Sequence, residues 1–191
     1  MDNQVVSPVK DGLKGTSVFL IGMMGAGKTT VGDLLATELG YRFFDTDSLI
    51  EKVAGKTITQ IFADEGEESF RELEGLVLSD LSAYTKLVVA TGGGIVLRQM
   101  NWSYLRHGLI IWLDVSVEVL VERLQNDTTR PLLQNPNPAS ALQKLLNQRG
   151  NLYAQADLQI QISANDTPEE ITARVIAEIP TVLKNPKYPI D

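Results

Sequence analysis

The stretch Val18-Phe-Leu-Ile-Gly-Met-Met-Gly-Ala-Gly-Lys-Thr-Thr30 decides the fold of this chain. It fits the spacing G-x-x-x-x-G-K-[ST] from Gly22 to Thr29, after a short apolar run and before a helical pattern. In that context the glycines allow a tight turn whose backbone N–H groups point at phosphate oxygens, and the start of the next helix adds further donors. We expect Lys28 to reach the β- and γ-phosphates of a nucleotide and the Thr29 hydroxyl to bind Mg²⁺.

The bulk properties indicate one globular domain, which we place at residues 16–183. The chain has 191 residues, of which 43% are hydrophobic and 21% charged. No apolar run approaches the roughly 18 residues of a membrane span, and no secretory signal is evident, so we expect a cytoplasmic protein. The absence of cysteine excludes disulfides and thiolate metal sites. A net charge of −7 argues against a nucleic-acid partner.

Short apolar segments alternate with longer helical patterns along the chain. The strand candidates are residues 17–21, 41–45, 87–91, 109–113 and 158–162. Helical spacing of apolar residues follows the phosphate loop and recurs at 67–84, at 117–124 and after Pro168. This alternation predicts the α/β class, with a parallel sheet covered by helices on both faces. The polar segments 1–15 and 184–191 are expected to be flexible tails.

Polar and glycine-rich residues follow two further strand candidates. Asp45 and Asp47 come at the end of the second, and Gly92–Gly94 follow the third. Parallel sheets bind ligands at the carboxyl ends of their strands, so these residues should meet the phosphate loop. Asp45 could hold Mg²⁺ together with Thr29, and Asp47 could orient or deprotonate an acceptor hydroxyl, although such a pair is often only a helix cap. The glycines favour close approach of a small ligand, or else form a flexible connector.

Four arginines could supply positive charge to this edge. Arg71 lies off the apolar side of the 67–84 helix, a position that is usually a solvated charge. Arg123, Arg130 and Arg149 cluster around a Pro- and Asn-rich stretch at about 126–138, with Arg130 inside it. That stretch is expected to be a mobile lid of the kind that closes over a transferring phosphoryl group, with an ordinary surface loop as the alternative.

As an ordered set, the motifs resemble those of the shikimate kinase family over residues of about 20–180. The residues that carry the resemblance are Gly22–Thr29, Phe44-Asp-Thr-Asp47, Phe70-Arg71, Gly92–Gly94, Thr129-Arg-Pro-Leu-Leu133, and Arg149 before Leu152-Tyr153. The resemblance implies a three-layer P-loop NTPase fold with five parallel strands in the order 2-3-1-4-5, plus a lid. It also implies transfer of the ATP γ-phosphate to the 3-hydroxyl of shikimate, a step of aromatic amino acid (chorismate) biosynthesis.

The resemblance also assigns roles to individual residues. The ATP phosphates would be held by Gly25, Ala26, Gly27, Lys28, Thr29 and Thr30, and adenine would lie near Arg123 and Pro168. Mg²⁺ would be served by Thr29 and Asp45. Shikimate would be held by Asp47, Arg71, Gly92, Gly93, Gly94 and Arg149, and the catalytic residues would be Lys28, Asp47 and Arg130 of the lid. Arginine suits this substrate, because its fork of donors grips a carboxylate in a two-pronged geometry.

Three alternatives remain at this stage. The first is another small-molecule kinase such as a gluconate kinase, which Arg71 and the glycines at 92–94 disfavour. The second is a nucleotide-dependent switch or binding module, although the chain contains no N-K-x-D motif for guanine. The third is an inactive relative, which the intact Lys28 and Asp47 disfavour. We expect a monomer that acts on a small molecule and ATP.

Overall fold

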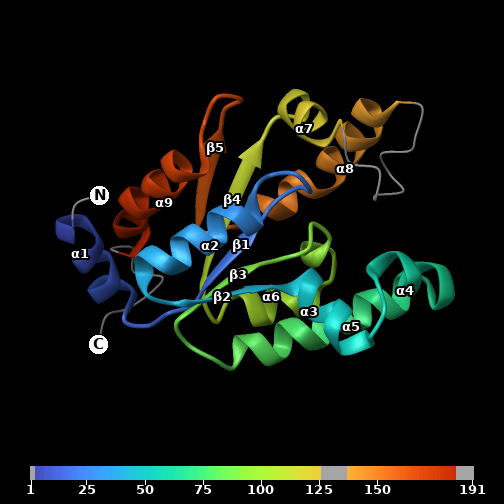
Figure 1. The fold of residues 1–191 in the computed structure, drawn as a ribbon, viewed down its shortest axis with the longest axis horizontal. Helices are drawn as coiled ribbons and strands as arrows, with labels where there is room; N and C mark the ends of the chain where they lie inside the picture. Colours follow the sequence, from blue (N-terminus) through green and yellow to red (C-terminus); the bar gives the residue numbers. More distant parts are fainter. Residues whose placement is uncertain (1–2, 126–136, 184–191) are drawn as a thin grey trace.

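The molecule is built around one five-stranded parallel sheet, seen in a computed structural model that describes residues 3–125 and 137–183 (Figure 1). The strands are β1 (Val18–Ile21), β2 (Arg42–Asp45), β3 (Leu87–Ala90), β4 (Leu109–Val115) and β5 (Leu158–Ile162). Their order is β2-β3-β1-β4-β5, and every neighbouring pair is parallel. This confirms the α/β class, the five strand candidates and the strand order that the family resemblance implies.

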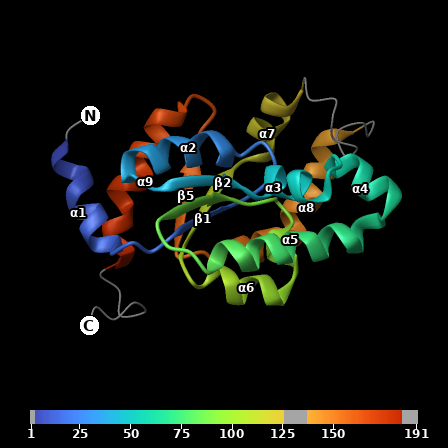
Figure 2. The same cartoon turned by 60° about the horizontal axis from the view of Figure 1, so that its bottom comes forward.

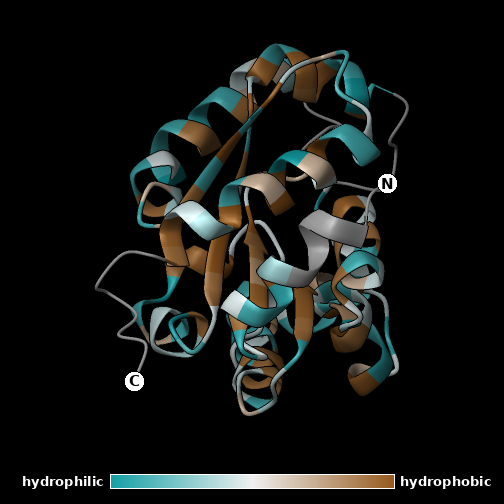
Figure 3. Ribbon diagram, turned by 90° about the vertical axis from the view of Figure 1, so that its left-hand side faces the viewer, coloured by the Kyte–Doolittle hydropathy of each residue, from teal (hydrophilic) through white to brown (hydrophobic). Residues whose placement is uncertain are grey.

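The hydropathy of the strands explains their place in the sheet. All residues of β1 and β3 are buried, and both are continuous apolar runs, as expected where helices cover both faces (Figure 3). In β5, at one edge of the sheet, buried and exposed residues alternate. The central strands therefore form the core, and the carboxyl ends of β1 and β3 lead into the phosphate loop and into Gly92–Gly94.

Helices cover the sheet in two layers (Figure 2). One layer holds α1 (Asn3–Leu13), α2 (Lys28–Leu39) and α9 (Pro168–Leu183), with α9 in contact with both of the others. The opposite layer holds α5 (Gly66–Ser82), α6 (Gln99–Leu105) and the short 3₁₀ helix η1 (Ile95–Leu97). The remaining helices are α3 (Thr46–Ala54), α4 (Ile58–Asp64), α7 (Val117–Leu124) and α8 (Pro138–Tyr153).

The expectation of a flexible tail at residues 1–15 is wrong over most of its length. Residues 3–13 form α1, in which Val9 and Leu13 are each only 1% exposed, and the helix packs on α9. The two side chains lie four residues apart, so they share one face of the helix. The pattern was obscured by Pro8 and Gly12, which usually interrupt helices; Gly12 here leaves room for the close approach of Leu183.

Two other expected segments meet the limits of the structure. The segment 184–191 lies outside the described residues, as does most of the expected lid, residues 126–136. The last residues of that lid belong to a helix instead: Asn137 caps α8 by accepting a hydrogen bond from the Ser140 N–H at 3.0 Å, and Pro138 is its first residue. Proline is favoured at that position because its missing N–H would have no partner there anyway.

Candidate active site

The phosphate loop joins β1 to α2 and is held open by three left-handed glycines. Gly22, Gly25 and Gly27 have φ of 140°, 76° and 91°, a region that other residues rarely adopt. A side chain at Gly22 would also place its Cβ 2.6 Å from the Leu113 carbonyl oxygen. The loop therefore needs glycine at these points, and Gly27 ends it directly at the N-terminus of α2, where unpaired N–H groups collect.

Lys28 crosses the loop from the first turn of α2. Its side chain is 8% exposed, and its Nζ donates to the carbonyl oxygens of Gly22 at 2.8 Å and Met23 at 2.7 Å. The ammonium group is thus held against the loop's own carbonyl oxygens, and its contact with a nucleotide phosphate stays a prediction.

The Asp45 carboxylate joins the phosphate loop to the second strand. One oxygen accepts from the Asp47 and Ser48 N–H groups at 3.0 and 3.2 Å and so caps α3. The other accepts from the Thr29 hydroxyl at 2.7 Å. The two residues predicted to serve Mg²⁺ therefore lie side by side. The Asp-x-Asp motif is indeed a helix cap, the alternative given in the sequence analysis, but the capping residue Asp45 also contacts the phosphate loop.

A cavity of about 280 Å³ lies where these pieces meet. The predicted residues that line it are Gly25, Gly27, Lys28, Thr29, Thr30, Asp45, Asp47, Gly92, Gly93 and Arg123. Ala26, within the loop, is 0% exposed and does not line this cavity. Arg130 lies outside the described residues.

A second cavity, of about 350 Å³, adjoins the first along the phosphate loop. Both are lined by Gly25, Gly27, Thr30 and Arg123, and the second also by Pro168. The Arg123 Nη1 lies 3.4 Å from the Gly25 carbonyl oxygen, which ties the end of α7 to the loop. The residues predicted near adenine are therefore brought together beside the phosphate loop.

Gly92–Gly94, the acceptor strip, follow β3 and connect it to η1. Their role is mainly to leave room for the protein's own side chains. A Cβ at Gly92 would lie 2.7 Å from the Glu74 carboxylate and 2.8 Å from that of Asp47, and one at Gly94 would overlap the Arg71 guanidinium. Gly94 has an ordinary φ of −95°, so space rather than backbone conformation requires glycine there. From the sequence we expected this room for a ligand, whereas the neighbours seen here are the protein's own side chains, so close approach of a ligand stays a prediction.

Glu74 is a buried neighbour of Arg71 and of the strip that sequence reasoning missed. It lies one turn after Arg71 on α5, is 0% exposed, and accepts from the Arg71 Nη1 at 3.0 Å. Burial raises the pKa of Glu74; Arg71 opposes the shift, the nearby Asp47 adds to it, and Arg149 opposes it slightly. Its other oxygen is buried without a hydrogen-bond partner in the described part of the chain. An acidic residue three positions after Arg71 was the only signal in the sequence.

Arg149 reaches the strip from α8. It is 9% exposed, and its Nη1 donates to the Gly93 carbonyl oxygen at 3.1 Å. Its Nε is buried and has no hydrogen-bond partner among the described residues. A buried donor without an acceptor is costly, which makes this arginine a candidate partner for an anionic ligand. Arg71 and Arg149 thus approach the acceptor strip from two different helices.

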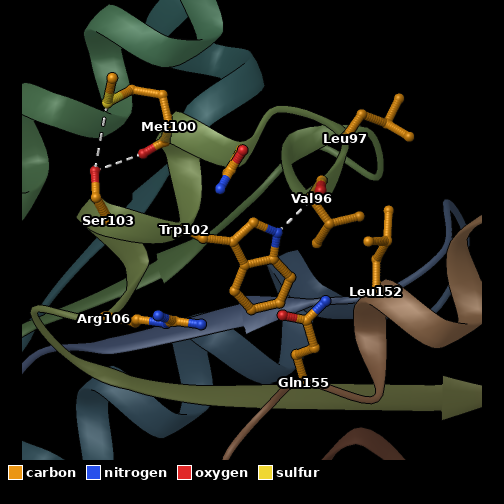
Figure 4. A pocket seen from close by; sticks show the side chains of 9 residues that line it. Val96, Leu97, Met100, Trp102, Ser103, Arg106, Leu152 and Gln155 are labelled. Carbon is orange, nitrogen blue, oxygen red and sulfur yellow. Dashed lines mark hydrogen bonds between the residues drawn. The ribbon is translucent and has the colours of Figure 1, made fainter.

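A larger cavity, of about 690 Å³, lies away from these residues, between η1, α6 and the end of α8 (Figure 4). Its walls are mostly apolar, with Arg106 at the rim, and none of the predicted site residues lines it. Within the described residues, no cluster of three or more His, Asp or Glu side chains is suited to a metal ion. No helix in that same part of the chain combines the length and apolar character needed to cross a membrane.

Comparison with known proteins agrees with the geometry of the site. The family model described as "Shikimate kinase" matches residues 24–180. The chain belongs to the shikimate kinase family. The curated shikimate kinase of Microcystis aeruginosa is 62% identical over 173 residues, covering 91% of each chain. The solved shikimate kinase of Acinetobacter baumannii in complex with shikimate is 39% identical, with a TM-score of 0.83 over 93% of this chain and 99% of its own.

A gluconate kinase, the first alternative, is less similar to this chain than the shikimate kinases are. A solved gluconokinase from Sinorhizobium meliloti has a TM-score of 0.57 at 20% identity, covering 91% of this chain and 97% of its own. At that identity the likeness concerns the fold alone. The shikimate kinase family is also where the ordered set of motifs placed the chain, so that resemblance is confirmed.

Proposed function

We propose that the cavity at the carboxyl ends of the strands transfers the γ-phosphoryl group of ATP to the 3-hydroxyl of shikimate. The observation that carries this proposal is the convergence of two unlike half-sites on one cavity. Lys28 and the phosphate loop line the cavity on the donor side, and Asp47, Gly92 and Gly93 line it on the other side. Arg149, which is buried, and Arg71, whose side chain is 12% exposed, contact the strip beside this cavity without lining it. Membership of the shikimate kinase family supports it, as does the similar A. baumannii enzyme, whose structure holds shikimate.

On the donor side, we propose that the loop N–H groups, Lys28 and Thr30 hold the ATP phosphates, with adenine in the adjoining cavity near Arg123 and Pro168. Arg130, beyond the described residues, would add positive charge to the transferring group. The charge that develops on the phosphoryl oxygens is then met by fixed donors, which is the main source of catalysis in such reactions.

The donor set also fits Mg²⁺. Thr29 and Asp45 offer a hydroxyl and a carboxylate oxygen 2.7 Å apart, and Mg²⁺ in nucleotide sites takes one or two such protein oxygens together with phosphates and water. When bound, the ion would neutralise charge on the β- and γ-phosphates. We propose Thr29 and Asp45 as the residues that serve it.

On the acceptor side, we propose that Arg71 and Arg149 bind the shikimate carboxylate, and that Asp47 and the strip's backbone orient its hydroxyls. The 3-hydroxyl oxygen forms the new bond to the γ-phosphorus as the bond to the β,γ-bridging oxygen breaks, leaving ADP. The hydroxyl proton passes to Asp47 late in transfer, because the loose transition state needs little base assistance. Asp47 is therefore chiefly an orienting group.

We also propose that the enzyme works as a cytoplasmic monomer in aromatic amino acid biosynthesis. The described residues that line the cavity include groups of both half-sites, so the proposed reaction needs no residue from a second copy. Light scattering is expected to give a mass near the 21.0 kDa of a single chain. A dimeric mass would contradict the monomer without affecting the assignment of the reaction.

The test of the function is ADP release by the purified protein, coupled to NADH oxidation, with shikimate, gluconate or water as acceptor. Of these three acceptors, only shikimate should support rapid turnover. Lys28→Met should abolish it while the protein stays folded by circular dichroism, because Lys28 supplies the only ammonium group over the loop among the described residues. Gluconate turnover at the rate of shikimate, or normal turnover by Lys28→Met, would overturn the proposal.

A further inference from the structure

The last residue of α8, Tyr153, is among the largest fully buried side chains of the protein. Its ring stacks on that of Trp112 in β4, with centroids 5.8 Å apart and planes at 30°. Its hydroxyl donates to the Gly93 carbonyl oxygen at 2.6 Å. Burial raises the pKa of Tyr153, with Arg149 opposing the shift, so the hydroxyl keeps its proton and remains a donor across the neutral range.

The acceptor strip has no side chains, so hydrogen bonds to its backbone must hold it in place. The Gly93 carbonyl receives two, from the Tyr153 hydroxyl and from the Arg149 Nη1. Because a peptide unit is planar, holding its carbonyl oxygen also fixes the direction of the N–H on its other side. Just beyond, the Trp102 indole donates to the Val96 carbonyl oxygen at 3.0 Å, which anchors η1 (Figure 4).

Tyr153 also contacts the donor half of the site. Its hydroxyl lies 3.8 Å from the Met23 sulfur, and the Met23 carbonyl oxygen accepts from Lys28. The strip itself touches the loop, since a Cβ at Gly93 would lie 3.4 Å from the Gly22 carbonyl oxygen. One buried hydroxyl therefore lies between the segment that approaches phosphate and the segment that approaches the acceptor.

We propose that Tyr153 is a positioning residue, whose hydroxyl holds the Gly93 carbonyl so that the acceptor strip and Arg149 stay aligned with the phosphate loop. The inference rests on the proposed function, because it assigns the strip to the acceptor. Tyr153 touches neither ATP nor shikimate in this account. It acts through Gly93 and through Arg149, which shares the same carbonyl oxygen.

The test is Tyr153→Phe, which removes the hydroxyl and keeps the ring that fills the core. Arg149 still bonds the Gly93 carbonyl, so the strip loosens without losing its last partner. The Kd of shikimate by calorimetry and its KM should each rise by about five- to tenfold, the change expected for one hydrogen bond. The kcat should also fall, because misalignment acts at the transfer step, while the KM of ATP stays within about twofold.

The matched control is Ser17→Ala. Ser17 is a hydroxyl residue 3% exposed at the other end of the sheet, where it donates to the Tyr84 carbonyl oxygen and accepts from the Leu87 N–H, each at 3.1 Å. This variant should lower Tm and leave both KM values unchanged. If Tyr153→Phe behaves like the control, or raises the KM of ATP as much as that of shikimate, the positioning role is refuted. Failure of the wild-type protein to phosphorylate shikimate would instead refute the proposed function.

Discussion

The Asp45 carboxylate uses both of its oxygens, and each belongs to a different task. One caps α3 through two backbone N–H groups, and the other accepts from Thr29 in the phosphate loop. The helix cap therefore fixes the direction of the oxygen that would serve the metal. At the level of single residues, the site is held by side chains that are shared between neighbouring elements in this way.

The two tasks of Asp45 can be separated by substitution. Asp45→Asn keeps an oxygen for the cap but loses the charge, so the free energy of unfolding should change by less than about 0.5 kcal/mol. The Mg²⁺ concentration for half-maximal activity should rise about tenfold. Asp45→Ala should add a loss of about 1 kcal/mol in urea unfolding, because the cap is gone. An unchanged Mg²⁺ dependence in Asp45→Asn would remove this residue from the metal site.

The Arg71 guanidinium occupies the space that Gly94 leaves open. Gly94→Ala should displace it and raise the KM of shikimate by about tenfold, with the KM of ATP unchanged. Arg71→Lys should act in the same direction, because it loses the two-pronged grip. The double variant should be less impaired than the sum of the two, since both changes act on one contact.

Gly150→Ala is the control for Gly94→Ala. Gly150 lies in α8 beside Arg149, and a Cβ there would meet nothing within 4 Å. This variant should keep wild-type kinetics and gain up to about 1 kcal/mol in stability, because alanine favours the helix over glycine. A change in the KM of shikimate with Gly150→Ala equal to that with Gly94→Ala would mean that the strip is not specially constrained.

At the scale of elements, α1 packs on α9 and lines neither of the two cavities beside the phosphate loop, which α9 reaches only through its first turn. The pair contacts α2 on the same face of the sheet, while Leu13 leads through a short turn to the amino end of β1 (Figure 1). The phosphate loop is at the opposite end of that strand. The packing of α1 should therefore support stability without touching the chemistry.

Leu13→Ala tests this separation. The side chain is 1% exposed, so its truncation should lower the free energy of unfolding by about 2–5 kcal/mol. The KM of either substrate should not change. Leu76→Ala is the matched control, since Leu76 on α5 is 64% exposed and its truncation should cost less than about 0.5 kcal/mol. Equal denaturation midpoints for the two variants would show that α1 is not part of the folded core.

For the whole molecule, charge is distributed unevenly. The chain has a formal net charge of −7. Four basic side chains nevertheless gather at the carboxyl ends of the strands: Lys28, Arg71, Arg123 and Arg149. A buried carboxylate, Glu74, lies among them, and its pKa is raised by burial. The positive charge that could bind an anion is therefore confined to this one site. The stability of the whole protein should depend on the protonation of Glu74 within it.

Glu74 should make stability fall as pH rises from near the ordinary glutamate value of 4.5 towards neutrality. The folded protein holds the Glu74 proton more tightly than the unfolded chain, so its contribution is complete at low pH and is lost through the raised pKa. In urea unfolding, the difference between wild type and Glu74→Gln should show this slope. Glu72→Gln, at an exposed position on the same helix, is the matched control for the substitution itself. A pH-independent difference for Glu74→Gln would contradict the raised pKa.

Local patterns predicted the parts of this protein that depend on local sequence. The phosphate loop and the strands have their own spacing, and Asp45 and Gly92 follow strand ends that a parallel sheet must bring together. Glu74 and Tyr153 contact a strip that is distant in sequence, and only the packing of α5 and α8 creates these contacts. No periodicity encodes such contacts. The helix α1 was missed because its tertiary packing overrides two local helix breakers, Pro8 and Gly12.

The crowding of Gly92 and Gly94 by charged side chains limits how this pocket could be redesigned. Glycine cannot be trimmed further, so no substitution in the strip would admit a bulkier acceptor. New volume on the α5 side would come from shortening Arg71 or Glu74, and under the proposed roles either change gives up part of the grip on a carboxylate. Engineering this scaffold towards larger alcohols would therefore trade away acid recognition, whereas smaller uncharged acceptors would require no enlargement.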